Sequence, residues 1–245
     1  MSLTVTVLGC SGSYAGPGGA CSGYLVQGGG VSVWLDAGPG TLAHLQRHLD
    51  LDDLDAVVLS HAHPDHWVDV LPYHNVLRHI RVRRGVPVVS PAEVRRLAGE
   101  VNGELRPAFD WQVVADGATV AIGGLGLGFS RTDHPPETLA VRVDGDGASL
   151  GYTADTGAGW SLSELGPGLG LALCEATLPA GDEDRFQHLT ARQAGESARA
   201  AGAARLVLTH LQPGVDPGRA RADGTAAFGA PVEVARIDAR YEVGG

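Results

Sequence analysis

The chain has 245 residues, of which 44% are hydrophobic and 19% are charged, so it is long enough to bury a full core as one domain. Its 28 acidic and 18 basic residues give a formal net charge of -10, which disfavours extended nucleic acid as a partner unless bound cations reverse the sign locally. Three cysteines without close spacing, no secretory signal pattern and no apolar run of membrane length favour a cytoplasmic protein with no disulfide framework and no membrane partner.

Hydrophobic periodicity predicts strands and helices in alternation along the chain. Strands are expected at 3–9, in a hairpin over 24–38, at 55–60, within 109–122, and at 125–134, 139–145, 148–155, 169–176, 205–210 and 232–243. Helices are expected at 41–50, 67–80 and 190–203, with another beginning near residue 90. Because the first part is rich in strands and both halves contain helices, we expect an α+β chain that forms a four-layer αββα sandwich, as a single domain over 1–245.

Two of the expected helices begin with capping signals. In the segment SPAE, Ser90 is expected to cap a helix that has Pro91 at its first position, and Glu93 would complete a capping box. Thr190 and Gln193 have the spacing of a second capping box. The second helix leads into a short predicted strand that ends in a histidine.

The segment HAHPDH, residues 61–66, directly follows a predicted buried strand and concentrates metal-binding residue types. His61 and His63 are two positions apart, so an extended segment can point both rings to one side. Asp65 and His66 lie where the chain turns toward a helix and can face a second point. Two pairs predict two divalent metal ions, and imidazole with carboxylate suits zinc, with manganese or iron as alternatives. Solvated polar residues at a helix entrance would not account for this set of ligand types.

HAHPDH resembles the HxHxDH signature of the metallo-β-lactamase superfamily of metallohydrolases, and the resemblance covers nearly the whole chain. LDAGPGT, TDHPPET, YTADTG and LTHLQPG are similar to further motifs of that family. The resemblance implies one metal ion held by His61, His63 and His134, and a second held by Asp65, His66 and His210. It also implies that Asp155 bridges the two ions. Asp36 is expected to hydrogen-bond a ligand imidazole, with a simple turn role as the alternative. Ala154 is a departure, because relatives usually carry glycine before the bridging aspartate.

Two further stretches resemble one branch of the superfamily, the tRNA 3′-processing endonucleases (tRNase Z) and their phosphodiesterase relatives. CEATLP contains Glu175 in an EAT-like motif, and QHLT contains His188 in an HxT motif. The resemblance implies phosphodiester hydrolysis by a hydroxide between the metals, with Glu175 orienting His188 as the general acid. Helix capping beside Thr190 is the alternative role for His188. Asp65, His188 and Glu175 are therefore the expected catalytic residues.

The expected substrate is small. Only about twenty residues separate His134 from Asp155, which leaves no room for the flexible arm with which the true tRNA processors grip tRNA. We therefore expect a small phosphodiester such as a cyclic nucleotide, because the compact chain resembles actinobacterial-type cyclic nucleotide phosphodiesterases. The alternatives are a tRNA 3′-processing endoribonuclease without the arm, a carboxyl-ester or lactone hydrolase, and a non-catalytic metal-binding module. The resemblance also implies a homodimer.

Other polar and aromatic residues are given weaker interpretations. Trp67 is expected in the core, with covering of the metal pocket or stacking on a base as alternatives. Tyr14 is a candidate substrate contact on the first glycine-rich loop. The basic segment 80–85 is interpreted as solvated surface rather than as a steering patch. Four further histidines are expected to be exposed and not to bind metal: His44, His48, His74 and His79.

Overall fold

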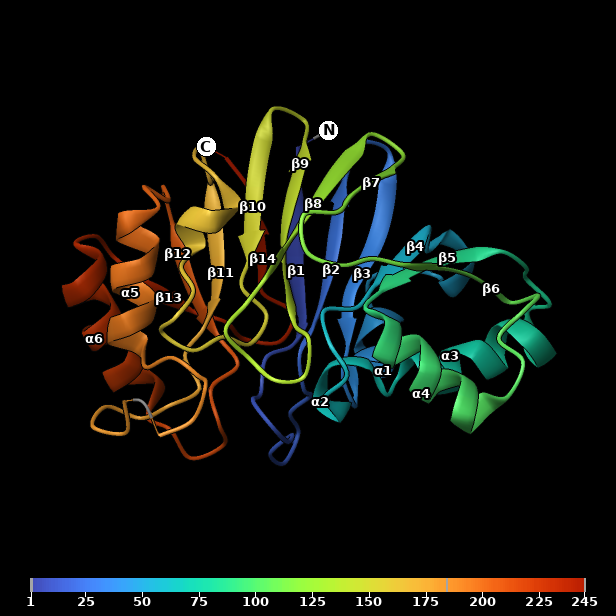
Figure 1. Ribbon diagram of the computed structural model, residues 1–245, viewed down its shortest axis with the longest axis horizontal. Coiled ribbons are helices and arrows are strands. Elements are labelled where there is room, and N and C mark those ends of the chain that lie inside the picture. The colour runs from blue at the N-terminus through green and yellow to red at the C-terminus, as the bar shows by residue number, and fades with distance from the viewer. Residues whose placement is uncertain (1, 184, 245) are drawn as a thin grey trace.

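Two seven-stranded sheets pack face to face, and helices cover their outer faces (Figure 1). The computed structural model describes residues 2–183 and 185–244. This architecture confirms the expected α+β fold with four layers in the order αββα. Among the described residues, no helix has both the length and the apolar character needed to cross a membrane.

The first sheet is built mainly from the first half of the chain and runs in the order β14-β1-β2-β3-β4-β5-β6. Its strands are β1 (Thr4–Gly9), β2 (Gly23–Gly28), β3 (Val31–Ala37), β4 (Ala56–Val58), β5 (Val86–Ser90), β6 (Phe109–Val113) and β14 (Arg240–Glu242). The helices near it are α1 (Thr41–Leu45), α2 (Pro64–Trp67), α3 (Val70–Asn75) and α4 (Ala92–Asn102). Strands β1 to β3 are antiparallel, whereas β3 to β6 are parallel.

The second sheet runs in the order β13-β12-β11-β10-β9-β8-β7. Its strands are β7 (Thr119–Ile122), β8 (Leu125–Arg131), β9 (Leu139–Gly145), β10 (Ala148–Tyr152), β11 (Leu171–Glu175), β12 (Leu206–Thr209) and β13 (Glu233–Val234). Helices α5 (Ala191–Ala200) and α6 (Pro217–Phe228) lie on its outer face (Figure 1). Short helical turns cover 51–53, 76–80 and 162–165.

Alternating side chains on the strands supply the core layers. On β3, Val33 and Leu35 face the central core between the sheets, whereas Trp34 faces the core under the helices of the first sheet. A third cluster fills the space between the second sheet and its helices. Burial on both faces explains why the strands are almost continuously apolar, and it leaves the strand ends as the places where polar side chains can gather.

Several local expectations differ from the structure. The helix predicted to begin at Ser90 begins at Ala92, because Ser90 ends β5 and its hydroxyl donates to the carbonyl of Pro91. The single strand predicted over 232–243 is two short strands in different sheets, separated by a turn in which Asp238 has a φ of 66°. By contrast, the capping box of Thr190 and Gln193 is present as predicted.

The helix expected at 67–80 is divided into the end of α2, then α3, and a π-helical turn over 76–80. His74 is buried, contrary to expectation, and its ring nitrogens lie near the carbonyl of Leu105 and the amide of Asn102. His79 is exposed as expected, and the exposed His48 has its Nε2 within hydrogen-bond distance, 2.8 Å, of Asp238.

Candidate metal centre

Strand ends from both sheets meet at one edge of the sandwich. His61 and His63 follow β4, and Asp65 and His66 lie on the first turn that follows, α2. In the second sheet, the candidate ligands follow the ends of β8, β10 and β12, and they are His134, Asp155 and His210. The residues that the sequence placed in two metal sites are thus brought together from five segments of the chain.

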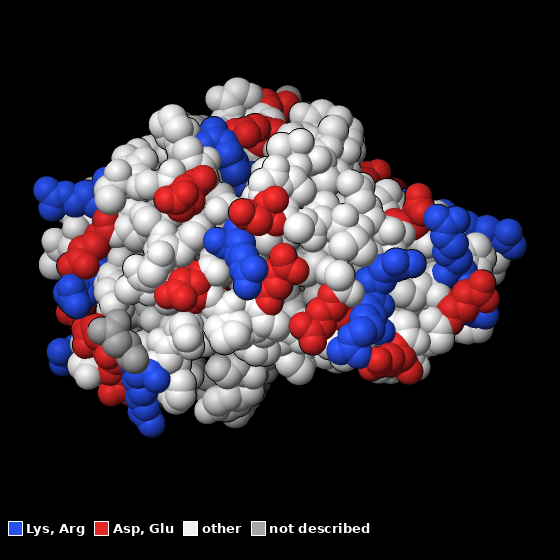
Figure 2. Space-filling model, in the orientation of Figure 1, with Lys and Arg blue, Asp and Glu red and all other residues white. Residues whose placement is uncertain are grey.

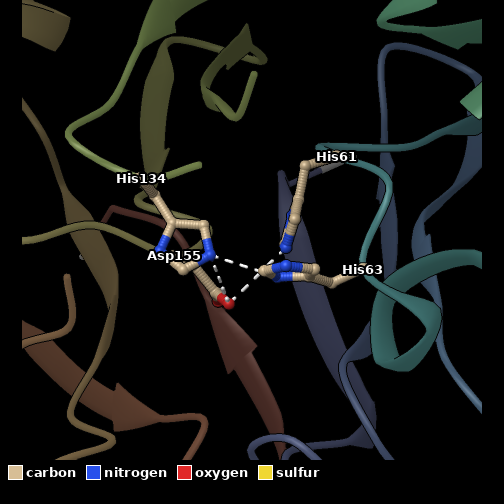
Figure 3. Close-up of side chains that lie close together, drawn as sticks. All are labelled: His61, His63, His134 and Asp155. Carbon is tan, nitrogen blue, oxygen red and sulfur yellow. Dashed lines mark hydrogen bonds and ion pairs between the residues drawn. The ribbon is translucent and has the colours of Figure 1, made fainter. Parts of the chain in front are cut away.

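The first group is formed by His61, His63, His134 and Asp155, whose side chains point toward one another (Figure 3). Oδ2 of Asp155 lies 3.5 Å from Nε2 of His61 and 3.8 Å from Nε2 of His134. Nδ1 of His63 lies 3.1 Å from Nε2 of His134. Four nitrogen and oxygen atoms therefore surround a single point.

The second group is formed by Asp65, His66 and His210. The Nε2 atoms of His66 and His210 are 3.1 Å apart, and Oδ2 of Asp65 lies 3.2 Å from Nε2 of His210. The other oxygen of Asp155, Oδ1, lies 3.2 Å from Nε2 of His66 and 3.5 Å from Nε2 of His210. Asp155 therefore turns one carboxylate oxygen toward each group, which is the arrangement a bridging ligand requires.

Hydrogen bonds fix the orientation of the His61 and His66 rings. Asp36 is fully buried and accepts hydrogen bonds from the Ser60 amide, the Ser60 hydroxyl, Nδ1 of His66 and the Tyr152 hydroxyl, at 2.7–2.8 Å. Because the Ser60 hydroxyl donates to Asp36, its oxygen accepts from Nδ1 of His61 at 3.0 Å. In their neutral form both rings therefore carry the proton on Nδ1 and face the centre with a free Nε2.

Hydrogen bonds at Nδ1 also orient the two rings from the second sheet. Nδ1 of His134 donates to the carbonyl of Gln187 at 2.8 Å, and a carbonyl can only accept. The Thr177 hydroxyl donates to Glu175, so it accepts from Nδ1 of His210 at 2.8 Å. These two rings also present Nε2 to the centre.

The inward-facing atoms fit bound cations. When both rings are neutral, Nε2 of His66 and Nε2 of His210 turn their lone pairs toward each other across 3.1 Å, and this contact is stable only with a proton or a metal ion between them. Nε2 of His61 and Oδ1 of Asp155 are buried and have no hydrogen-bond partner among the described residues. Ligands at about 2.0–2.1 Å around a tetrahedral zinc ion lie about 3.3 Å apart, close to the distances found here. The cluster can therefore hold metal ions.

Burial keeps the rings of the first group neutral. It lowers the pKa of His61 well below the usual value, and the nearby His66 adds to the effect. Burial also lowers the pKa of His134. A neutral imidazole is the form that binds a metal ion.

The surroundings of His66 favour positive charge. Burial would raise the pKa of Asp155, but His210 and His66 hold it well below the ordinary value, so the carboxylate is ionised. Burial opposes charge on His66, yet the carboxylates of Asp155 and Asp36 raise its pKa well above the usual value. A position that stabilises a proton between buried carboxylates is suited to a cation as well.

Three residues of the centre have positive φ angles without being glycine. They are Asp36 at 55°, Ala154 at 49° and His210 at 58°. The left-handed conformation costs an L-residue about 1–2 kcal/mol, and such strain is typical of functional sites. It also explains the departure at Ala154: the backbone there has the conformation that glycine adopts without strain, so alanine is accommodated at a conformational cost.

Gly12 allows the first glycine-rich loop to pack directly against His210. A Cβ atom on Gly12 would lie 2.3 Å from the His210 carbonyl oxygen and 2.9 Å from its Nδ1. The next residue, Ser13, donates its amide to Oδ2 of Asp65 at 2.8 Å. The loop over 10–19 therefore supports two of the candidate ligands.

The partly buried His188 pairs with the buried Glu175 beside the two groups. Nδ1 of His188 donates to Glu175 Oε1 at 2.9 Å, and the His188 ring lies 4.8 Å from that of His134 and 5.8 Å from that of His210, centre to centre. Glu175 also accepts hydrogen bonds from three backbone amides and from Thr177. Burial opposes charge on His188, but Glu175 raises its pKa to about 9, so the ring is a proton donor at neutral pH.

Several residues that contact the metal centre have no role predicted from the sequence. Ser13, Ser60, Tyr152, Thr177 and Gln187 contact candidate ligands or their partners. Two of them had a detectable signal, because Ser60 directly precedes the histidine segment and Thr177 is part of the EAT-like motif. The backbone amide and carbonyl contacts leave no signature in residue type.

The residues interpreted as non-catalytic belong to neither of the two ligand groups. Trp67 is buried among the apolar side chains under the helices of the first sheet, and its indole donates to the carbonyl of Ala62. In the basic segment, Arg81 forms exposed ion pairs with Asp50 and Asp52, which agrees with solvated surface. His44 lies 2.6 Å from the carbonyl of Leu8 and is only partly exposed.

Residues 31–211 match the beta-lactamase superfamily domain. Over 258 aligned residues the chain is 35% identical to an uncharacterized protein of Mycobacterium tuberculosis, with 99% of this chain and 93% of that one covered. It is 28% identical to the probable metallo-hydrolase YhfI of Bacillus subtilis, over 96% of this chain and 97% of the relative. It is also 28% identical to a ribonuclease Z of Mycobacterium avium, over 89% of each chain.

The fold agrees with these sequence relationships. The crystal structure of YhfI, described as a metallo-beta-lactamase fold protein, superposes with a TM-score of 0.90 at 26% identity, and the alignment covers 99% of this chain and 100% of the other. The similarity thus includes both sheets and the strand ends on which the candidate ligands lie.

Proposed function

The chain belongs to the beta-lactamase superfamily and is a metal-dependent hydrolase, and from this premise we propose that it hydrolyses a small phosphodiester, such as a cyclic nucleotide, with two bound divalent cations. The observation that carries the proposal is the pairing of His188 with Glu175 beside the two ligand groups. Hydrolysis of a phosphodiester requires protonation of a departing alkoxide, and this pair would supply the proton donor.

The ligand assignment follows the two groups. His61, His63 and His134 would hold one cation, Asp65, His66 and His210 the other, and Asp155 would contact both through separate oxygens. The nitrogen-rich donor set suits zinc, with manganese or iron as alternatives. When bound, the cations would supply charge neutralisation of the phosphate oxygens and a lowered pKa for the attacking water.

The side chains divide the proton transfers between them. The water oxygen bonds to phosphorus as the bond from phosphorus to the ester oxygen breaks. Asp65 is more exposed than Asp155, and it accepts the proton that water releases. His188 donates its Nε2 proton to the departing oxygen, and Glu175 holds the ring by its Nδ1–H. Asp36 accepts from Nδ1 of His66, so the neutral ring carries its proton there and would offer Nε2 to a cation.

A small substrate suits the surface. The formal net charge is -10, and on the face shown in Figure 2 the described acidic and basic side chains are interspersed rather than gathered into a basic stripe. Between His134 and Asp155 the chain forms β9 and β10 with short connections, so a tRNA-gripping arm is not inserted there. A tRNA 3′-processing activity is the second candidate, favoured by the ribonuclease Z relative. A homodimer and a cytoplasmic location remain predictions.

A substrate panel tests the proposal. Metal-restored protein is assayed against cyclic AMP, bis(p-nitrophenyl) phosphate, a precursor tRNA and an acyl lactone. We expect hydrolysis of the first two; cleavage of precursor tRNA alone would favour the second candidate, and lactone hydrolysis alone would remove the phosphodiesterase. Metal binding without any hydrolysis would indicate a binding module.

The role of His188 is tested separately with diesters that have good and poor leaving groups. His188→Ala should slow the diester with the poor leaving group far more than the nitrophenyl diester, because a poor leaving group depends more on protonation. An equal loss on both substrates would contradict the general-acid role.

A further inference from the structure

Two exposed aromatic residues adjoin, along the chain, residues that contact the metal centre. The chain has only 13 aromatic residues, 4 Trp, 5 Tyr and 4 Phe. Among the described residues only Tyr14 and Phe186 of this set are more than half exposed, each at 58%. An exposed aromatic ring leaves a large apolar surface in water, and its occurrence at a functional edge points to a ligand that covers it.

The backbone next to Phe186 is tied to the first ligand group. The adjacent residue, Gln187, accepts the hydrogen bond from Nδ1 of His134, and the amide of His188 donates to the carbonyl of Phe186 at 2.7 Å. Adjacent Cα atoms are about 3.8 Å apart, so Phe186 lies two positions from the proposed acid His188 and one position from the carbonyl that binds His134. The guanidinium of Arg185 lies 5.3 Å from the centre of the Phe186 ring, which favours a defined ring position.

Tyr14 has the corresponding place beside the second ligand group. Its neighbour Ser13 donates to Asp65, and Gly12 contacts His210. The Tyr14 amide donates to the carbonyl of Gly12 at 2.7 Å, so the loop makes a tight turn at this point. One exposed aromatic residue thus directly follows or precedes a residue that contacts each ligand group.

This inference rests on the proposed function and deepens it. A diester of two nucleosides has a base on each side of its phosphate, and a phosphate at the metal centre would direct one base toward each ring. A cyclic mononucleotide has one base and would use one ring. We propose that Phe186 and Tyr14 are stacking surfaces for nucleobases, so that the substrate class is a nucleotide diester rather than a diester of simple alcohols. Because Phe186 is close to His188, it would stack on the base of the nucleoside that carries the departing oxygen. Aromatic stacking suits every base, because each has a π face.

Equilibrium binding of a product-like ligand tests the proposal without catalysis. Adenosine monophosphate and inorganic phosphate are titrated calorimetrically into metal-loaded wild type, Phe186→Ala, Phe186→Trp and Tyr14→Ala. We expect Phe186→Ala to weaken the nucleotide about tenfold while phosphate binding is unchanged, and Phe186→Trp to retain nucleotide affinity. A smaller, nucleotide-specific loss is expected for Tyr14→Ala. Ile80→Ala removes a still more exposed apolar side chain on the 76–80 turn and should change the binding of neither ligand.

The outcomes separate this inference from the proposed function. Equal weakening of nucleotide and phosphate in Phe186→Ala would show that the residue only positions His134, and unchanged binding of both ligands would also overturn the stacking role. If Phe186→Ala or Tyr14→Ala changes the molecular mass in size-exclusion chromatography but not nucleotide binding, the rings contact another protein chain instead. If wild type hydrolyses no phosphodiester but loses base-dependent binding in Phe186→Ala, the stacking surface stands and the catalytic proposal fails.

Discussion

Replacing Asp36 with asparagine tests whether the orientation of ring protons underlies metal binding. Oδ2 of Asp36 accepts hydrogen bonds from the Ser60 hydroxyl, Nδ1 of His66 and the Tyr152 hydroxyl. With an amide nitrogen at that place, His66 must accept at Nδ1, which moves its proton to Nε2 and blocks the atom that faces the centre. If the amide rotates instead, its nitrogen faces the Ser60 amide, and that buried donor loses its partner.

Both arrangements carry a measurable cost. An unpaired buried donor costs about 1–3 kcal/mol of folding stability. Loss of a hydrogen bond that orients a ligand typically weakens metal binding about 10- to 100-fold, or about 1.4–2.7 kcal/mol. Competition with a chromophoric chelator measures the affinity, and urea unfolding of the metal-free protein measures stability. Asp55→Asn is the matched control, because Asp55 accepts from the Ser32 amide far from the centre. Wild-type affinity for both ions in Asp36→Asn would refute the reasoning.

Three further perturbations address the loop, the acid and the metal ions. Gly12→Ala should weaken metal binding, measured by chelator competition, because its Cβ atom would clash with His210. Gly99→Ala on α4 is the control: its Cβ atom meets open space, so metal binding should not change and the fold should be stabilised by about 0.5–1 kcal/mol. Equal metal affinity in both variants would contradict the close packing of Gly12 on His210. In wild type the His188 proton is retained below pH about 9 and lost as the pH rises through that value. Glu175→Gln removes the carboxylate that raises this pKa, so the alkaline decline of kcat should move toward pH about 6.5. An unmoved pH profile would show that the pairing does not cause the decline. Chelation should lower the melting temperature, because each ion at 100 times its Kd adds about 2.7 kcal/mol to the free energy of unfolding, and added zinc should restore it. A melting temperature that chelation does not change would argue against bound ions.

The sequence predicted the membership of the site better than its hydrogen bonding. Spacing within HAHPDH divides the ligands into two pairs, and the structure brings those pairs into separate groups joined by Asp155. The partners that orient the rings were largely missed, because the Gln187 carbonyl and the Ser13 amide act through backbone atoms that every residue possesses. Only a folded chain shows which peptide group faces which ring.

The fold was predictable where apolar patterns are strong and less so where they are weak. Helix α6 was missed because its buried face consists of Ala220, Gly224 and Phe228, which give little hydrophobic periodicity. It packs closely on α5, where a Cβ atom on Gly195 would lie 2.7 Å from the Gly224 carbonyl oxygen. The end of the chain was read as one strand because its alternation continues through Asp238, where a left-handed turn sends β14 to the other sheet.

The central claim is that this edge of the sandwich holds two cations on separate ligand groups that share one carboxylate. Anomalous diffraction at the zinc edge from fully loaded crystals tests it directly. The account predicts two peaks in each chain, one contacting Oδ2 of Asp155 and the other contacting Oδ1. The first peak should be surrounded by His61, His63 and His134, and the second by Asp65, His66 and His210. A single peak at full loading, or peaks away from Asp155, would contradict the account.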